Sequence, residues 1–169
     1  MRSEPISFSD SKLKGIELPH DDHQVVIAFL IANFTVEMML VDIGSSAGIV
    51  YLITYDKLQL PHSHIQPIAT PLTGFTCHVV YPSEIATLNF TVREGERTTK
   101  IKAQLTVVDI NHSSYDGLIG RPILIVLRAI ASHLHLKLKF PTTGGISEAC
   151  GNQKRARICY HCSVPPVNM

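Results

Sequence analysis

The chain has 169 residues, of which 45% are hydrophobic and 17% charged, so it is long enough for about one domain and too apolar for a disordered segment. Its formal net charge of +1 gives no field that would collect nucleic acid or anionic membranes. The longest apolar run, Val25 to Ala32, is far shorter than the ~20 residues of a membrane-spanning helix. The first dozen residues are polar and show no secretory signal, so we expect a cytoplasmic protein with no membrane partner and no nucleic-acid partner.

Alternation of apolar and polar residues predicts two β-hairpins. The first runs from Gln24 to Val41 and turns at Ala32-Asn33. The second has strands over 88–92 and 99–107, joined at Glu94-Gly95-Glu96. The fold class expected is therefore mainly β, with no alternation of strands and helices.

One segment, late in the chain, has the pattern of a helix. Proline follows Arg121, and an apolar stripe then runs from Ile123 to Leu134. A strand with one polar face, up to Pro141, would close the domain. These patterns divide the chain into an N-terminal segment (1–20), a folded domain (21–141) and a flexible tail (142–169).

Asp42 follows an apolar strand and begins the sequence Asp42-Ile43-Gly44-Ser45-Ser46. An isolated Asp-x-Gly is most often only a turn. Here a second element accompanies it, because Leu118-Ile119-Gly120 ends another apolar stretch directly before the helix.

Together these pieces resemble the retropepsin fold of aspartic proteases, and most of all the protease region of plant Ty3/gypsy-type retrotransposon polyproteins. The matching segments are the Asp42 loop, a flap-like stretch over 71–76, the stretch 115–122 and the helix and strand over 127–141. The resemblance implies a closed β-barrel half with one late α-helix, and it spans nearly the whole chain.

The resemblance also implies roles for individual residues. Asp42 would be the catalytic carboxylate in a loop with Ile43, Gly44, Ser45 and Ser46, with Ser45 donating a hydrogen bond to Asp42. Further groups are the flap, formed by Gly74, Phe75, Thr76 and Cys77, and the supporting turn before the helix, formed by Leu118, Ile119 and Gly120. A single Asp-x-Gly supplies half a site, so the active form would be a homodimer that cleaves an extended polypeptide, in retrotransposon polyprotein processing. The strand over 137–140 would either interleave across that dimer or lie at a sheet edge guarded by lysines. No cofactor is implied.

Ile43 stands where the family usually has Thr or Ser, whose hydroxyl bonds across the two-fold axis. We therefore predict activity that is weak and dependent on the dimer. A first alternative is a catalytically degenerate module that dimerises or binds peptides. A second is a serine hydrolase, because Gly44-Ser45-Ser46-Ala47-Gly48 fits G-x-S-x-G with Ser46 as nucleophile.

Cys159 and Cys162 have C-x-x-C spacing, but no second ligand pair at a definite spacing follows them. We therefore expect no metal site, and we expect free thiols in a loose tail. The basic cluster from Lys154 to Arg157 is expected to be solvated in the same tail.

Overall fold

A computed structural model describes residues 4–22, 24–67, 72–73, 79–80, 84–95, 97–110 and 113–163. The strands are β1 (Val25–Ile31), β2 (Phe34–Val41), β3 (Ile49–Tyr51), β4 (Ile65–Pro67), β5 (Leu72–Thr73), β6 (Val79–Val80), β7 (Glu84–Glu94), β8 (Arg97–Val108), β9 (Gly117–Ile119), β10 (Ile130–Ser132), β11 (Lys137–Thr142) and β12 (Gly145–Cys150). The helices are α1 (Leu52–Lys57), α2 (Arg121–Leu127) and α3 (Gln153–Ser163), with short 3-10 turns η1 (Asp10–Leu13) and η2 (His62–His64).

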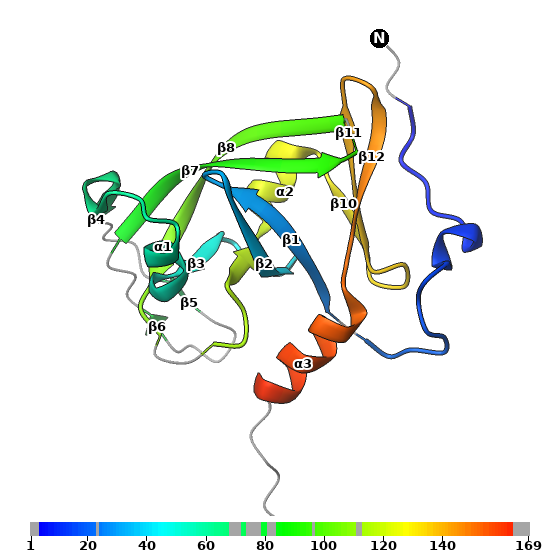
Figure 1. The fold of residues 1–169 in the computed structure, drawn as a ribbon, viewed down its shortest axis with the longest axis horizontal. Helices are drawn as coiled ribbons and strands as arrows, with labels where there is room; N and C mark the ends of the chain where they lie inside the picture. Colours follow the sequence, from blue (N-terminus) through cyan, green and yellow to red (C-terminus); the bar gives the residue numbers. More distant parts are fainter. Residues whose placement is uncertain are drawn as a thin grey trace, which may run out of the picture.

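Six strands close into a barrel. They pair in the order β1-β2-β9-β3-β8-β7, and β7 also pairs with β1, while β4 extends the sheet beyond β7 (Figure 1). The barrel interior is filled by large apolar side chains such as Phe29 and Phe90, whose rings meet edge to face at 6.4 Å. The expectation of a mainly β fold is confirmed.

The predicted hairpins are both present. β1 and β2 pair antiparallel, and the turn residues Ala32 and Asn33 have φ of 48° and 72°. Positive φ at both central residues is the geometry of the turn that best matches the twist of a hairpin. β7 and β8 pair over eleven residues of β7, from Glu84 to Glu94.

The predicted helix is shorter than its apolar stripe. α2 ends at Leu127 because Arg128 adopts a left-handed conformation, with φ of 53°. The last residues of the stripe, Ile130 and Leu134, are 51% and 53% exposed instead of facing the core. The stretch from Ile49 to Tyr55, rich in β-branched residues, forms β3 and then begins α1.

The expectation of a flexible tail is wrong for residues 142–163. β12 pairs with β11 from Gly145 to Cys150, in a three-stranded sheet of order β10-β11-β12. β11 is thus the central strand of its own sheet, paired on both sides at Lys137 to Lys139 and with β12 alone from Phe140 to Thr142, so its lysines do not guard a free edge. β12 was missed because its sequence alternates weakly and β11 supplies the pairing.

The polar face of β11 is buried because the N-terminal segment covers it. Lys139 is 8% exposed; its Nζ donates to the Ser7 carbonyl at 2.5 Å and lies 4.7 Å from the centre of the Phe8 ring. Glu148 accepts a hydrogen bond from Lys137 Nζ at 2.9 Å. In Figure 1 the N-terminal segment, in blue, runs along the outer side of this sheet.

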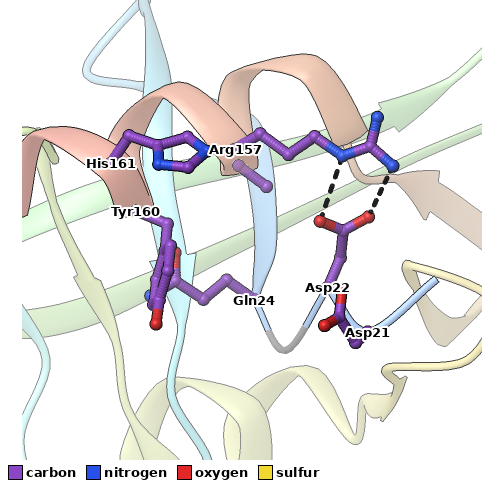
Figure 2. A pocket seen from close by; sticks show the side chains of 7 residues that line it. Asp21, Asp22, Gln24, Arg157, Tyr160 and His161 are labelled. Carbon is purple, nitrogen blue, oxygen red and sulfur yellow. Dashed lines mark hydrogen bonds and ion pairs between the residues drawn. The ribbon is translucent and has the colours of Figure 1, made fainter. Parts of the chain in front are cut away.

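α3 is fixed to the barrel and to the N-terminal segment. Arg155 pairs with Glu37 on β2 at 2.7 Å, and Arg157 pairs with Glu17 and Asp22 at 2.7 and 3.1 Å. Figure 2 shows the Arg157 guanidinium against Asp22 at the rim of a pocket beside α3.

Partial burial alone would raise the pKa of Asp22, but hydrogen bonds from Gln153 and Arg157 hold that pKa below its ordinary value. The expectation of a solvated basic cluster is therefore wrong for these two arginines.

Candidate active site

Asp42 lies directly after β2, where the strand leaves the barrel. Its N–H donates to the Ile119 carbonyl at 3.0 Å, which ties it to β9. Its half-buried carboxylate accepts a hydrogen bond from the Gly44 N–H, with a distance of 2.9 Å from nitrogen to Oδ1. A Cβ on residue 44 would lie 3.2 Å from that Oδ1, so glycine gives the carboxylate room.

The turn before α2 supports the Asp42 loop from below. β9 runs between β2, to which it is parallel, and β3, to which it is antiparallel, so Leu118 and Ile119 lie next to the strand that ends at Asp42. Gly120 passes under the loop so closely that a Cβ would lie 2.1 Å from the Ala47 carbonyl oxygen. This close approach explains the glycine, because its φ of −85° is available to any residue.

Arg121, the first residue of α2, holds the loop through its backbone carbonyls. Its guanidinium donates to the carbonyl oxygens of Gly44 and Ile43 at 2.8 and 3.3 Å, and its N–H donates to that of Ser45 at 3.0 Å. No role was predicted for this arginine. The available signal was its place between a strand-ending glycine and a helix-starting proline.

The serines of the loop do not act on Asp42 as expected. The Ser45 hydroxyl donates to the Ala47 carbonyl at 2.8 Å, so it stabilises the turn instead of donating to the carboxylate. Ser46 is exposed. After Gly48 the chain enters β3, whereas a nucleophile elbow continues into a helix. His135 is buried in the β10–β12 region, where its Nδ1 lies 2.7 Å from the Ser132 hydroxyl. The geometry is therefore not that of a serine hydrolase.

Apolar side chains are exposed around the loop. Ile43 is 57% exposed, and α2 presents Ile125 and Val126, which are 72% and 54% exposed. Ile125 follows Arg121 by about one helical turn, so it shares the helix face that meets the loop. The surface beside Asp42 thus combines a carboxylate with aliphatic residues.

Two other aspartates, Asp109 and Asp116, lie beside other strands of the barrel. Asp109 is exposed just after β8. Asp116 precedes β9, and its Oδ2 accepts a hydrogen bond from the Met38 N–H at 2.9 Å. That carboxylate therefore serves the pairing of strands.

The flap residues Gly74, Phe75, Thr76 and Cys77 lie outside the described residues. The short strands on either side of them, β5 and β6, pair antiparallel, with Leu72 opposite Val80 and Thr73 opposite Val79. Counting only His, Cys, Asp and Glu as ligands, the described part of the chain contains no group of three that could hold a metal ion. Nor does any described helix combine the length and apolar character needed to cross a bilayer.

A six-stranded barrel with β9 threaded between β2 and β3 beneath an Asp-x-Gly loop is the fold of retropepsin-like protease domains, and the fold expected from the sequence is confirmed. Among solved structures, the chain is similar to the retroviral protease-like domain of Ddi1 from Leishmania major, with a TM-score of 0.56, 12% identity, and coverage of 78% of this chain and 95% of that one. A retropepsin-like aspartic protease from Rickettsia conorii gives a TM-score of 0.42 and 15% identity, over 68% of this chain and 80% of that one. No protein-family model and no curated protein sequence matches the chain.

Proposed function

We propose that this chain is one subunit of an aspartic endopeptidase, a homodimer that hydrolyses peptide bonds with a water molecule held between two Asp42 carboxylates. The observation that carries the proposal is the position of Asp42. Asp42 is half-buried where β2 leaves the barrel, and its carboxylate accepts from the Gly44 N–H. Arg121 donates to the Gly44 carbonyl of the same loop, and the sequence contains no other Asp-x-Gly.

Peptide hydrolysis by carboxylates requires two of them. One must be ionised to take a proton from the attacking water, and the other must be protonated to polarise the carbonyl of the substrate. Two carboxylates that share a site divide these tasks because both cannot ionise cheaply, as in the dyads of aspartic proteases. A chain with a single such loop therefore needs a second copy.

The exposed aliphatic residues near the loop support a second copy as the partner. Ile43, Ile125 and Val126 would lose contact with water if two Asp42 loops met about a two-fold axis. The substrate we propose is an extended polypeptide, covered by the segment that contains Gly74, Phe75, Thr76 and Cys77. From the resemblance of the sequence to plant Ty3/gypsy-type proteases, we propose that the enzyme processes a retrotransposon polyprotein.

Ile43 favours one alternative, a degenerate module that dimerises or binds peptides without turnover. Isoleucine cannot supply the hydroxyl that bonds across the two-fold axis in this family. A lost buried hydrogen-bond partner costs about 1–3 kcal/mol for each unmatched group.

The test compares wild type with Asp42→Asn on a broad peptide library at mildly acid pH. Asp56→Asn is the matched control, because Asp56 is half-exposed on α1 and pairs only with His62 at the surface. We expect cleavage by wild type and by Asp56→Asn, and its loss in Asp42→Asn. Equal turnover by all three proteins would remove Asp42 from the mechanism. If all three proteins bind peptides and none of them cleaves, the degenerate module is established.

The oligomeric state is measured separately. A peptide-like aspartic-protease inhibitor is expected to shift the solution mass from 18.7 kDa to about twice that value, because a ligand that binds only the dimer stabilises it. An unchanged mass with saturating inhibitor would contradict the shared site.

A further inference from the structure

Sulfur-containing side chains from α3 and β2 meet where α3 packs on the barrel, outside the candidate active site. Cys159 on α3 is 1% exposed, and its Sγ lies 3.7 Å from the Sδ of Met38 on β2. Cys162 follows Cys159 by three residues in the same helix, a spacing that puts both side chains on one face. Cys162 is exposed and Met38 half-buried, so the group is open to solvent on one side.

The surroundings of the Cys159 thiol include the thiol of Cys162. Burial first, and then the neighbouring Cys162 and Asp116, raise the pKa of the Cys159 thiol, whereas Arg155 acts in the opposite direction. Neither cysteine is in a disulfide. The C-x-x-C pair, expected in a loose tail, is thus held on a helix against a thioether from another element.

Thiolates and thioethers are soft ligands, and together they select Cu(I) over harder divalent ions. If a metal ion lies about 2.3 Å from each of two sulfur atoms that are 3.7 Å apart, the sulfur–metal–sulfur angle is about 107°. This angle is close to the tetrahedral value and somewhat narrower than the trigonal one. Zinc would require about four ligands from Cys, His, Asp and Glu, and the described residues bring no three of these together.

We propose that Met38, Cys159 and Cys162 form a binding site for one Cu(I) ion. Binding exchanges the two thiol protons for the metal: both protons go to solvent, two copper–thiolate bonds and one copper–thioether bond form, and no electron is transferred. The resulting charge of −1 lies near Arg155, which is paired with Glu37 on β2. Copper would therefore link α3 to the strand that leads to Asp42.

The test uses the full chain, reduced and free of oxygen, in competition with the chromogenic Cu(I) chelator bicinchoninate. Because Cys77 and Cys150 are also thiols, the reference protein carries Cys77→Ser and Cys150→Ser. We expect this reference to bind one equivalent of Cu(I), with the ultraviolet absorption of copper–thiolate bonds. A parallel titration with Zn²⁺ is expected to show no binding at equal concentration.

Two further substitutions are made in that reference. Cys162→Ser changes an exposed residue, so folding is retained, and we expect loss of the bound equivalent. Met38→Leu keeps side-chain volume, a swap that cores tolerate well, and we expect at least tenfold weaker binding. Retention of copper by Cys162→Ser, unchanged affinity in Met38→Leu, or preference for Zn²⁺ would each overturn the three-sulfur site. Melting temperatures of the metal-free proteins confirm that each variant is folded.

Discussion

An aspartate lies at each end of β9, and the two carboxylates differ in how many hydrogen bonds they accept. Asp116, at the start, donates its N–H to the Met38 carbonyl and accepts from the Tyr51 N–H through its own carbonyl. Its carboxylate accepts from the Met38 N–H at 2.9 Å and from Thr54 Oγ1 at 3.5 Å. The carboxylate of Asp42, beyond the other end, accepts from the Gly44 N–H through Oδ1, and no other hydrogen bond from a described residue reaches this carboxylate. The Asp116 carboxylate thus stabilises the fold through both of its oxygens, whereas one Asp42 oxygen accepts no hydrogen bond from a described residue.

The largest effect is expected from Gly120→Ala, which attacks the support under the Asp42 loop. The new Cβ would lie 2.1 Å from the Ala47 carbonyl oxygen, and backbone would have to move to relieve that contact. We expect a loss of about 3 kcal/mol or more in the free energy of unfolding, measured with urea.

Gly144→Ala is the control for that substitution, since its nearest new contact would be Arg97 Nε at an ordinary 3.5 Å. The control is expected to change stability by less than about 0.5 kcal/mol. A similar small effect of Gly120→Ala would contradict the close approach.

The next effect separates the two aspartates directly. Asp116→Ala leaves the Met38 N–H without its acceptor, and we expect a loss of about 2 kcal/mol. Asp42→Ala removes one exposed hydrogen bond, and we expect a loss below about 1 kcal/mol. Equal losses in urea unfolding would show that the two carboxylates do not differ in structural role.

This contrast was only partly accessible from the sequence. Local alternation predicted both barrel hairpins, and the resemblance carried by the Asp-x-Gly and Leu-Ile-Gly segments implied a supporting turn before the helix. The end of α2 could not be predicted, because the apolar stripe continues past Leu127 and only the left-handed Arg128 stops the helix. β12 pairs with β11 directly before it, across the short turn at Thr143-Gly144, and was missed because its own alternation is weak. α3 depends on a partner far along the chain, Asp22, and no local pattern carries that information.

Glu148 extends the comparison to a third carboxylate, one surrounded by lysines. Burial alone would raise its pKa, but Lys137, Lys12 and Lys139 hold that pKa below the ordinary value of 4.5. A depressed pKa in the folded state means that the stabilisation is present above about pH 4.5 and is lost as pH falls through the folded-state pKa.

We expect Glu148→Gln to cost about 1–3 kcal/mol at pH 7, because it removes the negative charge that pairs with the buried ammonium groups of Lys137 and Lys139. The difference from wild type should shrink as the pH is lowered below the ordinary pKa. Urea unfolding at a series of pH values measures it, and a difference that grows in acid would reverse the assigned sign.

The smallest effect on the monomer, and the sharpest test of the Asp42 surface, is expected from residue 43. Ile43 is 57% exposed, so Ile43→Thr should change the unfolding free energy by less than about 0.5 kcal/mol. Ile43→Val is the matched control, because valine has the shape of threonine without the hydroxyl. If two loops meet as proposed, the threonine hydroxyls of the two copies add hydrogen bonds worth about 0.5–1.5 kcal/mol each, whereas both variants shorten the isoleucine side chain by the same amount. The threonine protein should then dimerise and cleave roughly tenfold better than the valine protein, since about 1.4 kcal/mol corresponds to a factor of ten. Sedimentation and peptide cleavage measure the two quantities independently. Identical behaviour of the two variants would mean that residue 43 faces no symmetry-related partner, and Asp42 would then lack its second carboxylate.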